Sequence, residues 1–360
     1  MAAWWQCSIA PELGELVLVF GELANMTATT SLPIGFTMGD AAGISPEIIV
    51  KLFAGGLPHA ALVYGDAGIL DSTLQRLGLQ ESLAVEIISE ADLASGRPGV
   101  IPVLNRWQAL PENLPPGQLN ALAGRGSYEY LCHAIDDAMA GKLRAIVTAP
   151  LHKKAMQAGG IDYPGHTEIL AERSGTSSYA MMLANPELRV ILATIHIPLA
   201  QVSGALSREL ELETIRLAQR ACLQAGIARP RVAVAGLNPH AGEDGRFGQE
   251  EIDIIAPAIE QARGEGIDAS GPWPGDTIFM RARKGEFDIV VAQYHDQGLI
   301  PVKYLGVDEG VNVTVGLPFV RTSVDHGTAF DIAGRGIADP ASLRAAYDLA
   351  LAMTPDSRNR

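Results

Sequence analysis

Short apolar runs alternate with segments of helical periodicity along most of the chain. Runs expected to form strands lie at residues 32–38, 61–65, 145–149 and 231–236, and segments expected to form helices lie at residues 45–54, 67–78, 151–159 and 248–263. Residues 126–140 and 206–225 carry apolar side chains at three- and four-residue spacing, which predicts helices that cover a sheet face. This alternation predicts an α/β protein with a largely parallel sheet.

The chain length and one loop-rich segment predict two α/β domains with a central cleft. With 360 residues, the chain exceeds the ~250 to 300 residues at which a single core stops growing. Prolines, glycines and asparagines gather at residues 104–126, and a last helix at residues 342–353 is expected to fold back onto the N-terminal half. We therefore expect a first domain of residues 32–150 plus 330–360 and a second domain of residues 151–329.

Residues 1–31 precede the regular pattern and are expected to form an N-terminal extension. Residues 1–25 contain three glutamates and no lysine or arginine, unlike a secretory signal or a transit peptide. We expect this extension to be disordered, or to stem from an upstream start codon assigned in error.

Charge and cysteine content exclude several classes of partner. The 27 basic and 41 acidic residues give a formal net charge of -14, so the chain as a whole repels nucleic acids and anionic membranes. An anionic ligand must therefore meet a local basic cluster. Cys7, Cys132 and Cys222 have no paired spacing, and no apolar run approaches the ~20 residues of a membrane span. These features predict a cytoplasmic protein without a disulfide framework.

Five histidines lie where expected strands give way to loops, and three of them are candidate metal ligands. The five are His166, His196, His240, His295 and His326. Loops at the carboxyl ends of strands often carry function in open α/β sheets. His196, His240 and His295 each follow a β-rich run, and three imidazoles from separate loops can hold zinc or another divalent ion. The alternative is a set of hydrogen-bonded loop histidines, because intervals of 44 and 55 residues carry no local metal motif.

A second set of residues is suited to an anion. Lys303, Asn312 and Arg321 follow one another at nine-residue intervals, with His166 and Thr167 as further donors upstream. A lysine charge and a guanidinium fork match the oxygens of a phosphate. The alternative is that Lys303 and Arg321 are ordinary surface charges.

Two further segments leave their interpretation open. Residues 38–47, "MGDAAGISPE", precede an expected helix but lack the GxGxxG spacing of a dinucleotide loop, so a standard Rossmann site is only weakly indicated. Asp325, next to His326, is expected either to orient an imidazole or bind a hydroxyl group, or to cap a helix.

Six strings of the sequence together resemble the 4-hydroxythreonine-4-phosphate dehydrogenase (PdxA) family of pyridoxal phosphate biosynthesis. The strings are "GHTE", "ATIHIPL", "LNPHAGEDGRFGQEEID", "GPWPGDTIF", "YHDQG" and "GVNVTVGLPFVRTSVDHGTAFDIAG". The resemblance covers roughly residues 34–350. It implies a fold similar to isocitrate and isopropylmalate dehydrogenases, an oxidation linked to NAD or NADP, and a homodimer whose metal site draws on both subunits.

The resemblance also implies roles for individual residues. His196, His240 and His295 would hold a divalent metal (zinc, magnesium, cobalt or manganese), while the substrate contacts would be His166, Thr167, Lys303, Asn312 and Arg321. In this family 4-hydroxythreonine 4-phosphate is oxidised to a 3-oxo acid, which decarboxylates to 3-amino-2-oxopropyl phosphate. A metal that chelates the hydroxyl group would stabilise the alkoxide while hydride leaves. Asp276, Asp296 and a metal-bound water remain open as the general base.

Three departures from the family pattern keep other substrates open. Ala41 and Ser45 stand where the family usually has proline and glycine, and the proline of "HDQGLIPVK", residues 295–303, is shifted by one position. The shifted form resembles paralogues that oxidise D-threonate or D-erythronate 4-phosphate, or a carboxylated cyclohexadiene cis-diol in aromatic degradation. A metal-dependent phosphatase and a non-catalytic sensor of a phosphorylated metabolite are the alternatives outside the dehydrogenases.

Overall fold

The structure, a computed structural model, describes residues 32–91, 97–306 and 310–354. Residues 32–360 belong to one unit, and residues 1–31 are assigned to another. The expected N-terminal extension therefore lies outside the described residues.

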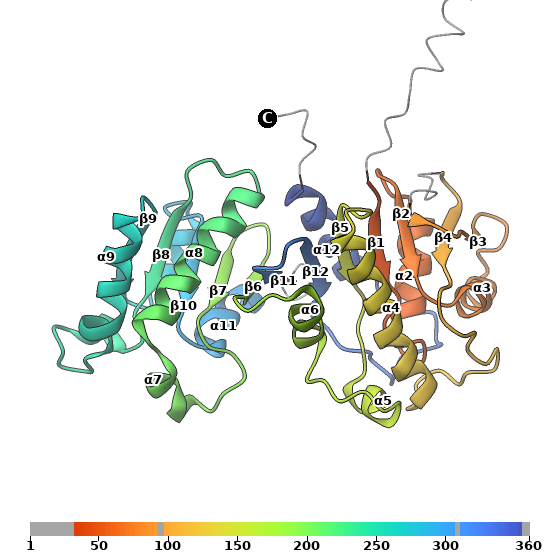
Figure 1. Ribbon diagram of the computed structural model, residues 1–360, viewed down its shortest axis with the longest axis horizontal. Coiled ribbons are helices and arrows are strands. Elements are labelled where there is room, and N and C mark those ends of the chain that lie inside the picture. Colours follow the sequence, from red (N-terminus) through yellow and green to blue (C-terminus); the bar gives the residue numbers. More distant parts are fainter. Residues whose placement is uncertain (1–31, 92–96, 307–309, 355–360) are drawn as a thin grey trace, which may run out of the picture. The chain divides into compact units, whose positions relative to one another are not determined.

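The first half of the described chain alternates strands and helices as predicted (Figure 1). Its elements are β1 (Ile34–Thr37), α2 (Ser45–Ala54), β2 (Ala61–Tyr64), α3 (Ala67–Arg76), β3 (Ala84–Ile87), β4 (Val100–Leu104), α4 (Ala121–Met139), β5 (Ala145–Thr148), α5 (Lys153–Ala158) and α6 (His166–Ser174).

The second half begins with two strands and ends with a helix. Its elements are β6 (Ala180–Ala184), β7 (Arg189–Leu192), η2 (Leu199–Gln201), α7 (Val202–Ala205), α8 (Arg208–Gln224), β8 (Arg231–Ala235), η3 (Pro239–Gly242), η4 (Glu251–Ile255), α9 (Ala256–Gly264), β9 (Asp268–Trp273), α10 (Ile278–Arg283), β10 (Ile289–Ala292), α11 (His295–Leu305), β11 (Val311–Val315), β12 (Val320–Val324) and α12 (Ala341–Ala352).

One twelve-stranded sheet runs through the described residues in the order β3-β4-β2-β1-β5-β12-β11-β6-β7-β10-β8-β9. Its strand pairs are parallel except for β12 with β11, β11 with β6, and β6 with β7. The prediction of an α/β fold with a largely parallel sheet is thus confirmed. The antiparallel pairs lie together in the middle of the sheet, between two parallel halves.

Helices cover both faces of the sheet in its second half. Successive residues of β7 and β10 point to opposite faces, as strand geometry requires. Ile191 and Val291 pack with α8 and α9 in one apolar core, whereas Val190 and Val290 pack with α10 and α11 in another. The strands are therefore apolar on both faces, which explains their continuous β-branched runs.

The last helix returns to the N-terminal half, as predicted. Helix α12 packs against β12, β5 and α2. The ring of Tyr347 stacks on that of Phe36 in β1, with 5.8 Å between ring centroids. The division into domains of residues 32–150 plus 330–360 and 151–329 stays a prediction, because the sheet is continuous across it.

Two helices start differently from the prediction, whereas the other predicted helices start within two residues of their observed positions. Helix α4 begins at Ala121 rather than at residue 126, since the side chain of Asn120 accepts hydrogen bonds from the backbone N–H groups of Leu122 and Ala123. The helix expected at residues 248–263 starts with a π-helical turn, Glu251–Ile255, before α9.

None of the helices in the described ranges is long and apolar enough to cross a membrane. The thiols of Cys132 and Cys222 are free and buried.

Gly124 is expected to be required for the contact between α4 and α5. A Cβ atom at this position would collide with the backbone of Ala155 and Met156. Gly124→Ala should therefore lower the free energy of unfolding by about 1 to 3 kcal/mol, measured by urea denaturation. Gly264→Ala is the matched control, because Gly264 is also helical and a Cβ there meets nothing within 4 Å. We expect the control to be neutral or up to about 1 kcal/mol more stable, and equal effects of the two substitutions would contradict the close packing.

Candidate active site

A cavity of about 300 Å³ lies beside the antiparallel centre of the sheet. Seven of the expected site residues line it: His166, Thr167, His196, His295, Lys303, Asn312 and Arg321. They come from α6, the loop after β7, α11, β11 and β12. The structure therefore brings the five candidate substrate contacts together with two of the three candidate metal ligands.

The register of β11 and β12 explains why residues nine positions apart meet. Asn312 pairs with Ser323 across the antiparallel ladder, so Arg321 lies on the same face, two residues from Ser323. The Arg321 guanidinium donates hydrogen bonds to the Thr314 hydroxyl at 3.0 Å and to the Thr148 hydroxyl in β5 at 2.6 Å. It also approaches the Asn312 amide oxygen at 3.4 Å. Three neighbouring strands thus hold one guanidinium at the cavity.

Arg321 is a buried cation without a counterion in the described part of the chain. Only 3% of the residue is exposed, none of its hydrogen-bond partners is a carboxylate, and its Nε has no partner. Burial lowers the pKa of the guanidinium, since removal from water disfavours the charged form. A guanidinium remains charged in proteins, so an anion bound in the cavity would relieve this cost.

Lys303 adds a second cation and is held by an acid. Its Nζ lies 2.7 Å from Oδ2 of Asp325, which follows β12. Of the two alternatives left open for Asp325, the helix cap is wrong, because β12 is followed by a bend at this residue. The carboxylate instead orients the ammonium group of Lys303 toward the same cavity.

His166 and Thr167 open helix α6 and form another wall of the cavity. Burial first, and then the positive charges of Arg321 and Lys153, lower the pKa of His166 well below its usual value. The imidazole is therefore neutral at physiological pH, and the backbone of Ala149 accepts a hydrogen bond from it. A neutral imidazole adds a directional hydrogen-bonding group without a further positive charge.

His196 and His295 form a pair of imidazoles at the cavity. Their ring centroids are 5.8 Å apart. His295 Nδ1 lies 2.7 Å from Oδ1 of Asp296, which fixes the tautomer and leaves Nε2 available as a ligand. Metal-binding histidines commonly have such a carboxylate partner, so this pair fits a divalent metal. The part of the chain that the structure describes contains no group of three or more His, Cys, Asp or Glu side chains placed to hold a metal ion.

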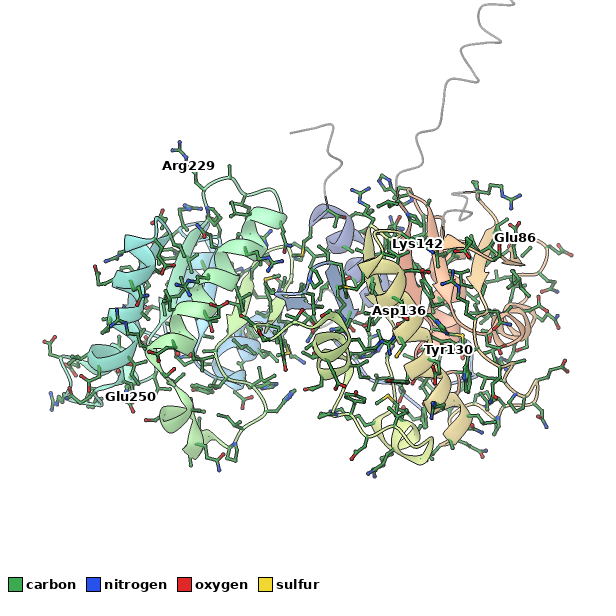
Figure 2. All side chains as sticks on the ribbon, in the orientation of Figure 1. Glu86, Tyr130, Asp136, Lys142, Arg229 and Glu250 are labelled. Carbon is green, nitrogen blue, oxygen red and sulfur yellow. The ribbon has the colours of Figure 1, made fainter. Side chains whose placement is uncertain are left out.

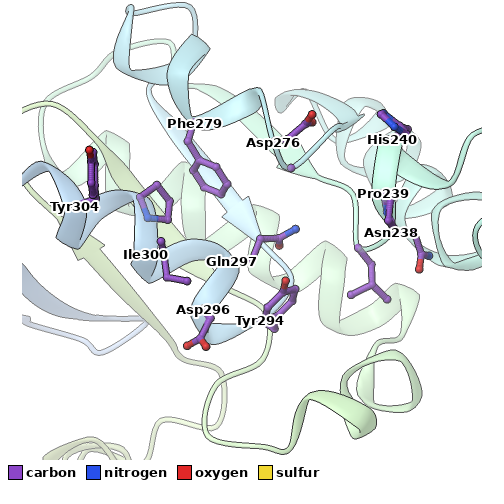
Figure 3. Close-up of a pocket in the computed structure, with 13 residues that line it drawn as sticks. Asn238, Pro239, His240, Asp276, Phe279, Tyr294, Asp296, Gln297, Ile300 and Tyr304 are labelled. Atoms are coloured by element: carbon purple, nitrogen blue, oxygen red, sulfur yellow. The ribbon is translucent and has the colours of Figure 1, made fainter.

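The remaining expected residues line a different cavity, of about 730 Å³ (Figure 3). His240, Asp276 and Asp296 all border it. Figure 3 shows His240 and Asp276 beyond Phe279 and Gln297, away from Tyr304. A single chain therefore does not bring His240 into the cavity that holds His196 and His295.

Lys153 also lines the first cavity, although no motif in the sequence pointed to it. Lys153, the first residue of α5, borders it together with Gly165 and His166. Its charge lowers the pKa of His166, so it contributes to the positive potential of the site. Lys153 belongs to no recognisable motif and is followed by Lys154, so the sequence alone does not distinguish it from a surface lysine.

Hydrogen bonds made by Gln293 and Gln297 connect the three histidine loops to one another. The Thr194 hydroxyl donates to the backbone oxygen of Gln293 at 2.7 Å, which joins the loops of His196 and His295. The Gln297 side chain accepts from the Gln293 backbone N–H at 2.6 Å and donates to the Gly236 carbonyl at 2.7 Å, which joins the loop of His240. The loops that carry the histidines are therefore fixed relative to one another within the chain.

Glu211 of α8 lies behind this network and is fully buried. Its Oε2 lies 3.5 Å from Nε2 of Gln293, and its Oε1 has no partner. Burial raises the pKa of this carboxyl group to about 8, so it is protonated at neutral pH.

Comparison with known proteins shows close relatives over most of the chain. Residues 58–350 match the family described as pyridoxal phosphate biosynthetic protein PdxA. A 4-hydroxythreonine-4-phosphate dehydrogenase of Beijerinckia indica is 52% identical over 320 residues, which cover 88% of this chain and 94% of that relative. A D-threonate 4-phosphate dehydrogenase of Cupriavidus necator is 49% identical over 315 residues, with coverage of 86% and 93%.

A solved structure agrees with the fold. The crystal structure of a 4-hydroxythreonine-4-phosphate dehydrogenase from Klebsiella pneumoniae superposes with a TM-score of 0.83 at 44% identity, and the match covers 90% of this chain and 100% of that one. The two proteins therefore share the same overall fold.

The raised pKa of Glu211 predicts that a neutral replacement stabilises the protein. In the unfolded chain the carboxyl group has its ordinary pKa of 4.5, so folding at neutral pH must protonate it. Stability is therefore lost as the pH rises from 4.5 to about 8. Glu211→Gln should remove this loss and raise the free energy of unfolding by about 3 kcal/mol near neutral pH, measured by urea denaturation across that range. Glu209→Gln, on the exposed side of the same helix, is the control, and identical pH profiles for wild type and Glu211→Gln would contradict the prediction.

Proposed function

This chain belongs to the pyridoxal phosphate biosynthetic protein PdxA family, and from that membership and the first cavity we propose that it oxidises a 4-phosphorylated hydroxy acid with NAD or NADP. The preferred substrate is 4-hydroxythreonine 4-phosphate, and D-threonate 4-phosphate is the runner-up, because relatives of nearly equal identity carry each name. The chain is a dehydrogenase in either case.

The observation that carries the proposal is the unpaired guanidinium of Arg321 beside the His196–His295 pair. Arg321 has no carboxylate partner among the described residues and lines a cavity that also contains Lys303 and Lys153. A phosphate would supply the missing counterion and accept hydrogen bonds from Arg321 and Lys303. The reacting carbon would then lie toward the two histidines, which border the same cavity.

Each residue of the first cavity would have its own role in the proposed reaction. A bound divalent metal and nicotinamide would supply the Lewis acid and the hydride acceptor. Arg321, Lys303 and Asn312 would hold the phosphate and thereby fix the distance to the reacting carbon. His166 is kept neutral and donates its one N–H to the Ala149 backbone, so its other ring nitrogen would accept a hydrogen bond from a substrate hydroxyl group. The hydroxyl proton would pass to a carboxylate, for which Asp276 and Asp296 are the candidates.

The third metal ligand, His240, would come from a second copy of the chain. His240 is exposed and lies in the other cavity, as does Asp276. Two large apolar side chains of α11 also line that cavity and are exposed. Ile300 is 63% exposed and Tyr304 is 90% exposed. Covering such residues favours association of two copies, and in a twofold dimer each copy could present His240 and Asp276 to the cavity of the other.

Several finer properties stay predictions. The choice among zinc, magnesium, cobalt and manganese depends on ligands that the two copies would share. The sequence has no GxGxxG motif, so it does not indicate whether the enzyme prefers NAD or NADP. A cytoplasmic location is proposed because the three cysteines show no paired spacing in the sequence.

The proposed reaction is tested by following nicotinamide reduction with a panel of substrates. The panel contains 4-hydroxythreonine 4-phosphate, D-threonate and D-erythronate 4-phosphates, their unphosphorylated counterparts and a carboxylated cis-dihydrodiol, each with and without a chelator. We expect turnover of a 4-phosphorylated member, its loss with chelator, and a KM higher by about 100-fold without the phosphate, as expected for the loss of ~2 to 3 kcal/mol of charge-assisted hydrogen bonds. Phosphate release without nicotinamide reduction would replace the proposal by the phosphatase alternative.

The shared site is tested by mixing two inactive variants. His196→Ala and His240→Ala homodimers should each lack a complete set of ligands. In a mixed dimer, one of the two sites would combine His196 and His295 of one copy with His240 of the other. Equal mixing under exchange conditions should therefore restore about a quarter of wild-type activity, measured as nicotinamide reduction. Mixtures that stay inactive, although mass spectrometry shows mixed dimers, would refute the sharing of ligands.

A further inference from the structure

The loop that carries His240 has an unusual backbone. Six consecutive residues, 240–245, all have positive φ, with values of 52°, 52°, 82°, 44°, 56° and 87°. Only two of them, Gly242 and Gly245, are glycines. A left-handed conformation costs a non-glycine residue roughly 1 to 2 kcal/mol, so the surrounding structure must impose it on His240, Ala241, Glu243 and Asp244.

The carboxylate of Glu251 lies inside this loop. Glu251 is only 3% exposed, and both of its oxygens accept hydrogen bonds from Asn238. Oε1 accepts from the backbone N–H at 2.7 Å, and Oε2 accepts from the side-chain Nδ2 at 2.9 Å. A Cβ at Gly242 would lie 2.8 Å from Oε2, and one at Gly236 would lie 3.0 Å from Oε1. The chain therefore closes around the carboxylate before and after His240.

Glu251 is buried without a cationic partner in the described ranges of the chain. Among the residues that the structure describes, its hydrogen bonds come from Asn238 alone, and none of their ion pairs involves it. Burying a carboxylate in this way is expensive, and an apolar residue would fill the same space at lower cost. The residue is also the first of the π-helical turn Glu251–Ile255, and such turns occur frequently at functional sites.

A neighbouring acid connects the same asparagine to the loop of His196. Glu250, labelled in Figure 2, accepts a hydrogen bond from Asn238 Nδ2 at 2.7 Å through Oε2. Its other oxygen accepts from the hydroxyl of Ser203 in α7, the helix that follows the His196 loop. Asn238 is thus fixed from two sides, and Glu251 provides the side that is buried.

We infer that Glu251 is a positioning residue that holds residues 240–245 in their left-handed conformation, so that His240 projects from the chain toward a metal shared with a second copy. The inference rests on the proposed metal site. It assigns Glu251 no contact with metal or substrate: the carboxylate acts through Asn238 and the backbone, and it fixes His240 before a metal binds.

The test is the affinity of the full-length dimer for zinc, measured by competition with a fluorescent chelator. Glu251→Gln keeps the shape of the side chain but offers one acceptor oxygen where Asn238 presents two donors. Zinc affinity should fall by about 10- to 100-fold, the range found when a partner that orients a metal ligand is removed. Glu260→Gln is the matched control, because Glu260 is an exposed glutamate of α9 that forms an ion pair with Arg263. It should leave the affinity unchanged.

A second readout needs neither metal nor activity. In the metal-free protein, amide hydrogen exchange of residues 238–245 should be faster in Glu251→Gln than in wild type, while exchange in β8 and α8 stays unchanged. If Glu251→Gln does not fold, Asn238→Ala serves instead, because it removes the side-chain bond and keeps the backbone bond. It should weaken zinc binding in the same direction by a smaller factor.

The outcomes separate the two proposals. If His240→Ala lowers zinc affinity but Glu251→Gln and Asn238→Ala do not, the positioning role is overturned and the metal site stands. If His240→Ala leaves zinc affinity unchanged, the proposed metal site is overturned, and the positioning role falls with it. Unchanged hydrogen exchange of residues 238–245 in Glu251→Gln would overturn the positioning role by itself.

Discussion

The antiparallel pairing of β11 with β12 is the constraint on which the candidate site depends. Strand β12 is parallel to β5 on one side and antiparallel to β11 on the other, so it joins the two parallel halves of the sheet. Its register places Arg321 within reach of Thr148 in β5 and Thr314 in β11. A shift by one residue would turn Arg321 to the opposite face of the sheet and empty the cavity of its central charge.

This constraint explains the electrostatics of the cavity. A guanidinium fixed by hydroxyl groups keeps its full charge uncompensated, since threonines accept hydrogen bonds but carry no charge. The field of Arg321 and Lys153 in turn contributes to keeping His166 neutral. Lys303 is the exception, because Asp325 holds it in an ion pair. In a chain with a formal net charge of -14, a positive cavity of this kind selects anions by local arrangement and not by overall charge.

The fold was predictable from the sequence, and the grouping of site residues was predictable only in part. Alternating strands and helices follow from local periodicity, so the α/β class and most elements could be predicted, including the return of α12. Lys303, Asn312 and Arg321 could be grouped by their residue types, their nine-residue spacing and the resemblance to the PdxA family. Lys153 and Glu211 could not, since they approach the site through tertiary packing and stand in no motif. The π-helical turn at Glu251–Ile255 was also missed, because its periodicity differs little from that of an α-helix.

The same reasoning explains why His240 is the one candidate ligand that lies apart. Hydrogen bonds of Thr194, Gln293 and Gln297 fix the loops that carry all three histidines. A loose loop is therefore not the reason why His240 lies apart from the other two. Residues 240–245 have a left-handed backbone around the buried carboxylate of Glu251, and this conformation costs free energy. Such strain is typical of functional sites, which agrees with a role for the outward direction of the His240 imidazole. The exposed imidazole of His240 lines the same cavity as the exposed Ile300 and Tyr304, an arrangement that suits the proposed ligand sphere completed by a second copy. Dimer formation and metal binding would then stabilise one another, because each metal would bridge the two copies.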